Sequence, residues 1–70
     1  MVLTEIEKTV LRCLAEGMQS KEIALTLKRS KPTVEGYIRM LYAKLDAKSR
    51  AHLVVLAIRN GIITEIEDGA

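Results

Sequence analysis

Most of the side chains that could bind an anion lie in the middle of this sequence. Residues 21–50 carry eight Lys or Arg against three acids, a net charge of +5, whereas residues 64–70 carry three acids and no base. A solvated charged surface explains many such clusters. Basic groups gathered on one stretch are also what binding to nucleic-acid phosphates requires. The charge pattern therefore raises phosphate binding as a hypothesis, and the elements that hold these cations must decide it.

Catalysis and metal binding find little support. Cys13 is the single cysteine and His52 the single histidine, so neither has a partner of its own kind for a disulfide or a metal cluster. We interpret Cys13 as a small buried side chain, with a redox-sensing thiol as the alternative, and His52 as a surface residue. The acids near the N-terminus fit helix capping and charge balance. With no nucleophile–base set or phosphate loop, we expect no enzyme, metal or cofactor.

Residues 20–45 predict two helices joined by a short polar turn. Ser20 is expected to cap the first helix, and Ser30 the second, which has Pro32 in its first turn. Apolar residues recur at helical spacing in both helices. Those expected to face inward are Ile23, Ala24 and Leu27, then Val34, Ile38, Leu41, Tyr42 and Leu45. A short helix, a tight turn and a longer helix form a helix-turn-helix, although this pattern also fits a plain α-hairpin.

A helix is predicted on each side of this pair. The first follows the capping-box spacing of Thr4 and Glu7, and Gly17 ends it; its inward residues are expected to be Ile6, Val10, Cys13 and Leu14. The last runs from a Ser49 cap to Asn60-Gly61, with Leu53, Leu56 and Ala57 toward the core. Its remaining sides are also apolar, which indicates that a partner covers them. The expected interface is Ala51, Val54, Val55 and Ile58.

The fold class follows from length and composition. Seventy residues make one domain, and no stretch alternates with the period of a strand, so the class expected is all-α. We assign residues 1–63 to this domain and residues 64–70 to an acidic, flexible tail. The sequence has no apolar run of transmembrane length and no leader pattern, which favours a cytoplasmic protein without membrane contact.

Several short motifs resemble one family in their order and spacing. They are the K-E-I-A of residues 21–24, the S-x-x-T-V of residues 30–34 and the Y-x-K-L of residues 42–45, with L-T-E at residues 3–5 upstream and Arg50 and I-R-N-G-I at residues 58–62 downstream. Together they resemble the LuxR/GerE-type helix-turn-helix over residues 3–63. The resemblance implies a four-helix domain of a bacterial transcription regulator. It further implies that the third helix enters the major groove of double-stranded DNA and that the fourth forms a homodimer, with RNA polymerase or another regulator as a further partner.

The resemblance also suggests which residues contact DNA. Arg39 is the best candidate for a base edge, most simply guanine, and a glutamate in the groove can accept from cytosine. Arg29 and Glu35 depart from the commonest family residues. Gly36 either permits close approach to DNA or is a tolerated surface glycine. The expected DNA-binding set is Lys28, Arg29, Ser30, Lys31, Thr33, Glu35, Gly36, Arg39, Lys44, Lys48 and Arg50.

Two other functions remain open at this stage. A sigma-factor-like promoter-recognition module shares the helix-turn-helix, but it usually ends there, and the complete fourth helix argues against it. A protein-interaction module that captures another regulator without binding DNA is the second alternative, which the unusual Arg29, Glu35 and Gly36 keep open.

Overall fold

The computed structural model describes residues 3–63, and within that range it contains four helices and no strand. The helices are α1 (Glu5–Ala15), α2 (Ser20–Leu27), α3 (Lys31–Leu45) and α4 (Arg50–Arg59). The expected all-α, four-helix domain is therefore confirmed. The expected acidic tail, residues 64–70, lies outside the described residues. None of the helices in the described part of the chain is long and apolar enough to span a membrane.

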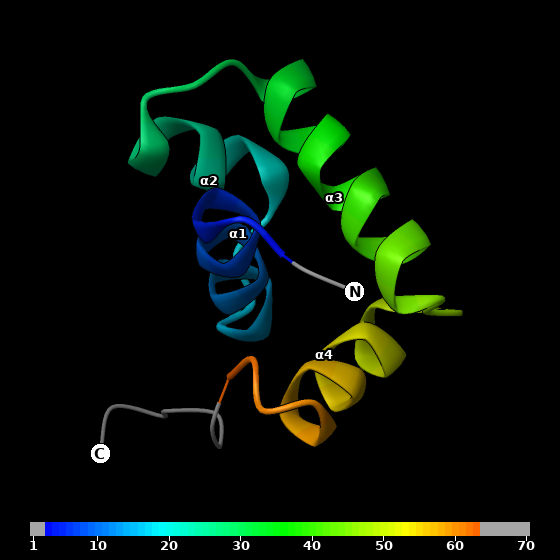
Figure 1. Cartoon of the computed structure of the whole chain (residues 1–70). Coiled ribbons are helices and arrows are strands. Elements are labelled where there is room, and N and C mark those ends of the chain that lie inside the picture. Colours follow the sequence, from blue (N-terminus) through cyan, green and yellow to red (C-terminus); the bar gives the residue numbers. More distant parts are fainter. Residues whose placement is uncertain (1–2, 64–70) are drawn as a thin grey trace.

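Helix α3 is the longest element and contacts each of the other three helices. Figure 1 shows it running along one side of the molecule, with α1 and α2 beside it and α4 beyond its C-terminal end. α1 also packs against α4. Because α3 is the helix that the other elements share, its position depends on contacts from both ends of the chain.

Side chains cap the N-terminal ends of the helices much as the sequence predicts. Ser30 Oγ accepts from the Thr33 N–H at 3.2 Å, and Ser49 Oγ accepts from the His52 N–H at 3.1 Å. The start of α2 differs from expectation, because Ser20 is the first helical residue and Gln19 precedes it as the cap. The Gln19 N–H donates to Glu22 Oε1 at 3.0 Å, so a carboxylate three residues ahead replaces the expected serine cap.

The core is aliphatic and takes side chains from every helix. Its buried members are Leu3, Val10, Leu11, Leu14, Ile23, Ala24, Val34, Leu41, Leu45, Leu53, Ala57 and Ile63. The predicted inward side of α1 was partly wrong. Cys13 is half-buried but packs against the core, as expected, whereas Ile6 is half-buried and lies outside the core cluster. Leu11 and Glu7 are buried instead. The buried stripe of α1 is therefore rotated toward Glu7, which makes this carboxylate the one buried charged side chain in residues 3–63.

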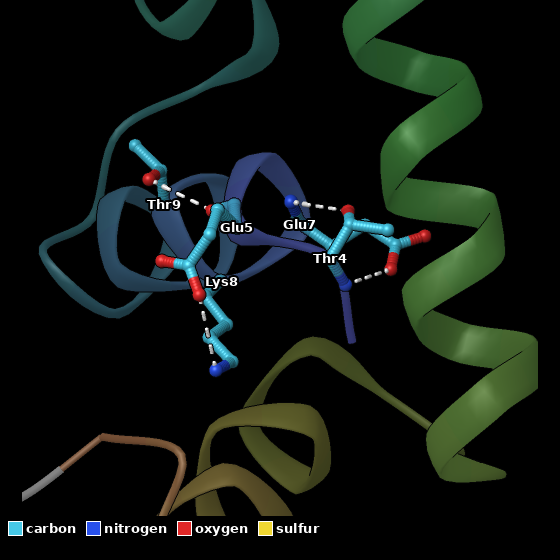
Figure 2. Close-up of polar contacts among 5 residues, drawn as sticks. All are labelled: Thr4, Glu5, Glu7, Lys8 and Thr9. Atoms are coloured by element: carbon cyan, nitrogen blue, oxygen red, sulfur yellow. Dashed lines mark hydrogen bonds and ion pairs between the residues drawn. The ribbon is translucent and has the colours of Figure 1, made fainter. Parts of the chain in front are cut away.

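Glu7 is stabilised in the core by bonds from two directions. Its Oε1 accepts from the Thr4 N–H at 2.9 Å, while its own N–H donates to Thr4 Oγ1 at 3.2 Å, which completes the capping box drawn in Figure 2. The same Oε1 accepts from Lys44 Nζ at 2.8 Å, which joins the start of α1 to the end of α3. The bond from Lys44, followed by the one from the Thr4 backbone, lowers the pKa of Glu7.

Glu7→Gln should therefore reduce the free energy of unfolding by about 1–3 kcal/mol at neutral pH, because Gln can still accept from Thr4 but cannot pair with Lys44. A carboxylate whose pKa is lowered in the folded state stabilises that state at any pH above its unfolded-state pKa, which is near 4.5. This stabilisation is lost as the pH falls through the pKa of the folded state. The difference between wild type and variant should thus be constant from pH ~6 to ~8 and shrink in acid. Urea unfolding followed by circular dichroism measures it.

The matched control is Glu5→Gln. Glu5 is on the same helix, but its side chain is 89% exposed and its ion pair with Lys8 is long, at 3.4 Å. We expect a change within about 0.5 kcal/mol. Equal losses at the two positions, or a Glu7→Gln effect that persists undiminished in acid, would show that the ion pair with Lys44 does not stabilise the fold.

Candidate nucleic-acid interface

The turn between α2 and α3 is three residues long and is fixed by its backbone. Lys28 has left-handed dihedral angles, φ 57° and ψ 45°, and its N–H donates to the Leu25 carbonyl at 3.3 Å. The next N–H, that of Arg29, donates to the Ala24 carbonyl at 2.9 Å. A non-glycine residue in this region costs about 1–2 kcal/mol, so the turn is held by its neighbours rather than by local preference. It brings Lys28 and Arg29 to the start of α3.

The first turn of α3 is closed by hydroxyl groups. Ser30 Oγ lies 2.8 Å from Thr33 Oγ1, and Pro32 occupies the first turn, where no N–H is needed. Lys31, Pro32 and Thr33 are all exposed. The N-terminal end of α3 is thus open to solvent and carries a cation on each side of its serine cap.

The side of α3 that faces away from the core carries Arg39, Met40 and Ala43, all exposed. Glu35 and Gly36, expected on the same side, are half-buried. The Arg39 side chain lies back toward Gly36: a methyl group placed on Gly36 would have Arg39 Nη2 as its nearest neighbour, at 3.8 Å. The outward side of this helix therefore presents one cation beside a half-buried position that has no side chain.

The cations of the expected set separate into two groups. One group is exposed, and the structure gives its side chains no polar partner within residues 3–63: Lys28, Arg29, Lys31, Arg39 and Lys48. The other group has partners inside the protein. Lys44 Nζ is bound to Glu7, and Arg50 Nη2 donates to the carbonyls of Leu14 at 3.0 Å and Met18 at 2.6 Å.

No local sequence pattern indicates these internal roles of Lys44 and Arg50. The last carbonyls of a helix have no partner within its regular bonding pattern. The Leu14 carbonyl accepts from the Gly17 N–H at 3.0 Å, and Arg50 adds a second donor there. This connects the end of α1 to the start of α4. Contact of Lys44 or Arg50 with DNA stays a prediction, but both side chains already contribute to the fold.

The apolar surface of α4 is narrower than expected. Val55 and Ile58 are 43% and 38% exposed, and Ala51 is exposed at the same helical spacing. Val54, also expected in the dimer interface, is half-buried and packs against the core. Its place in an interface stays a prediction. The uncovered stripe of α4 therefore consists of Ala51, Val55 and Ile58. A further exposed leucine, Leu25 on α2, was missed; its position off the Ile23–Leu27 face was the available signal.

The described residues contain neither a metal cluster nor a thiol with a lowered pKa. No three His, Cys, Asp or Glu residues among them lie close enough to hold a metal ion. Cys13 is a free, half-buried thiol, and burial, followed by the charge of Glu16, raises its pKa. A protonated thiol is a poor nucleophile. His52 Nδ1 accepts from the Lys48 N–H at 3.0 Å, so this ring helps to start α4.

Comparisons with known proteins agree with this arrangement. The sequence profile described as "Bacterial regulatory proteins, luxR family" matches residues 1–57. The chain is 44% identical over 62 residues to the transcriptional regulatory protein YdfI of Bacillus subtilis, which is 89% of this chain and 29% of that protein. It is 44% identical over 61 residues to the Bordetella pertussis virulence factors putative positive transcription regulator BvgA, covering 87% of this chain and 29% of that one.

A third relative is the nitrate/nitrite response regulator protein NarP of Escherichia coli. It is 43% identical over 58 residues, which is 83% of this chain and 27% of NarP. The chain thus spans less than a third of the length of these relatives. No solved structure matches it.

The internal role of Arg50 can be tested by stability alone. Arg50→Ala should lower the free energy of unfolding by about 1–3 kcal/mol, because the carbonyls of Leu14 and Met18 lose a charged donor. Lys48→Ala removes a neighbouring exposed cation whose side chain has no polar partner within residues 3–63, and it should change stability by less than about 0.5 kcal/mol. Both are measured by urea unfolding. Equal, small effects would mean that Arg50 does not support the fold.

Proposed function

The chain belongs to the luxR family of bacterial regulatory proteins, and we propose that it is a sequence-specific DNA-binding domain of a transcription regulator. Regulators of this family bind DNA. The finer parts of the proposal concern how this chain does so: α3 enters the major groove, and α4 pairs with a second copy. A protein that acts on bacterial DNA works in the cytoplasm, which is the location we propose.

The observation that carries the proposal is a group of five exposed cations at the turn before α3, on its first turn and outer side, and in the loop after it, namely Lys28, Arg29, Lys31, Arg39 and Lys48. These five side chains have no ion-pair partner within residues 3–63, so their charge is available for phosphates. Lys28, Arg29 and Lys31 surround the N-terminal end of α3, where the helix dipole also favours an anion. Phosphate contacts there would fix the position of α3 on the duplex.

Base recognition falls to the outward side of α3. Arg39 can donate two hydrogen bonds to the O6 and N7 atoms of guanine. Glu35 can accept from the N4 amino group of cytosine, and Ser30 and Thr33 can contact phosphate or a base edge near the helix start. Gly36 leaves room for the DNA to approach the helix backbone.

The proposed dimer uses the stripe of Ala51, Val55 and Ile58 on α4. Full burial of a Val or Ile side chain contributes roughly 1.5–3 kcal/mol. Covering the exposed part of these side chains in a dimer would therefore be favourable. A symmetric pair would place two copies of α3 about one DNA turn apart, ~34 Å, and favour an inverted repeat. One helix per subunit makes a small interface, so we expect a dimer that is weak without DNA. RNA polymerase or another regulator is a further proposed partner.

Arg39→Ala should weaken binding to the preferred duplex by about 1–3 kcal/mol and leave binding to random duplex almost unchanged, because a base contact carries specificity whereas a phosphate contact does not. The preferred duplex comes from selection out of random sequences, and fluorescence anisotropy at low salt gives both affinities. Lys31→Ala is the matched control: it should weaken both duplexes alike and reduce the slope of log K against log salt by about 0.9.

Two outcomes would change these assignments. If Arg39→Ala weakens both duplexes equally, Arg39 contacts phosphate rather than a base. If the wild-type chain binds no duplex at low salt, the DNA-binding proposal fails, and the protein-interaction module becomes the better hypothesis.

Val55→Glu should leave the subunit folded, because Val55 is 43% exposed, but weaken self-association and cooperative binding to two half-sites. Binding to a single half-site should barely change. Circular dichroism, analytical ultracentrifugation and anisotropy measure the three properties. Val54→Glu is the contrasting variant: Val54 packs against the core, so this substitution should lower the free energy of unfolding. Unfolding of the Val55→Glu subunit would place Val55 in the core and refute the proposed interface.

A further inference from the structure

The outward side of α3 contains a small apolar spot beside Arg39. Met40 is one of four large hydrophobic side chains exposed in residues 3–63, and it is 48% exposed. At about 100° per residue, Met40 lies ~40° to one side of Gly36 and Arg39 ~60° to the other, so the three share one side of the helix. The spot therefore has the half-buried Gly36 in the middle, a thioether on one side and a guanidinium on the other.

Nothing inside the protein requires a glycine at position 36. Its φ is not positive, in contrast to Gly17 and Gly61. A methyl group there would meet only Arg39 Nη2, at 3.8 Å, which is ordinary van der Waals contact. Helix propensity favours alanine over glycine at such a position. A position without a side chain at Gly36 is useful where something outside this chain approaches the helix closely.

The proposed function states what approaches this side of α3, and DNA offers one apolar group there. In the major groove the bases present hydrogen-bond donors and acceptors, and the only methyl group is the 5-methyl of thymine. Arg39 matches the acceptors of guanine, and the surrounding cations match the phosphates. Met40 matches neither, because a thioether is apolar and a weak acceptor at most.

We propose that Gly36 and Met40 form a contact for the 5-methyl group of a thymine that neighbours the guanine bound by Arg39. The side chain of a helical residue leans toward the N-terminus of its helix, so Met40 leans toward the turn that carries Gly36. A methyl group seated over Gly36 would lie between the thioether and the guanidinium. This assignment rests on the proposed function and adds to it a reason for selecting thymine over cytosine.

The test removes the methyl group and nothing else. In a duplex selected by the wild-type chain, each thymine is replaced singly by deoxyuridine, which keeps the base pair, and affinity is measured by fluorescence anisotropy. We expect at least one thymine next to a guanine in each half-site at which the replacement weakens wild-type binding about 4-fold, the equivalent of ~0.8 kcal/mol for one buried carbon group. Met40→Ala should bind the thymine and deoxyuridine duplexes about equally.

Leu25→Ala is the matched control, since Leu25 is a large exposed hydrophobic residue on α2 rather than α3. It should keep the full 4-fold methyl effect. A methyl effect that survives in Met40→Ala, or that Leu25→Ala abolishes equally, would overturn the assignment. So would a preferred duplex in which no single deoxyuridine changes affinity; in that case DNA binding itself stands. Failure to bind any duplex would instead refute the proposed function.

Discussion

The position of α3 depends on one buried carboxylate. Glu7 caps the first turn of α1 through Thr4 and binds Lys44 near the end of α3, so a single side chain satisfies a helix end and joins two helices. Burying a charge is costly unless it is paired and hydrogen-bonded, and Glu7 is both. If the pair were broken, a charge would remain in an aliphatic core. This gives α1 and α3 one preferred register, and with it a defined direction for the helix that carries Arg39.

The basic residues differ in whether they have a partner inside the protein. Lys44 and Arg50 both make polar contacts inside the protein. Lys44 binds the Glu7 carboxylate, and Arg50 binds the Leu14 carbonyl in the last turn of α1 and the Met18 carbonyl in the loop after it. The five exposed cations of the expected DNA-binding set that have no polar partner within residues 3–63 lie at the turn before α3, on its first turn and outer side, and in the loop after it. Arg12, Lys21 and Arg59 are exposed elsewhere on the chain. Of the cations in the expected DNA-binding set, two thus make contacts inside the protein and five are exposed without such a contact within residues 3–63. A net charge of +2 conceals this division.

The sequence predicted what depends on near neighbours. The caps of Thr4, Ser30 and Ser49 each involve residues within a few positions of one another. The Glu7–Lys44 and Arg50–Leu14 bonds span 37 and 36 residues, and no local pattern announces them. Periodicity also placed Val54 outside the core, whereas this side chain in fact packs against the core. Because α4 carries apolar residues on nearly all its sides, its sequence does not show which side the other helices cover.

The junction between α3 and α4 connects the two halves of the proposed function. Asp46 ends α3 in a left-handed conformation, the Ala47 N–H donates to the Tyr42 carbonyl at 3.1 Å, and Ser49 caps α4. His52 accepts from the Lys48 N–H at 3.0 Å within the same loop. A junction so short and so fully hydrogen-bonded leaves little freedom between the helices. Pairing through α4 would therefore set the distance between two copies of α3, so that dimer geometry selects the half-site spacing.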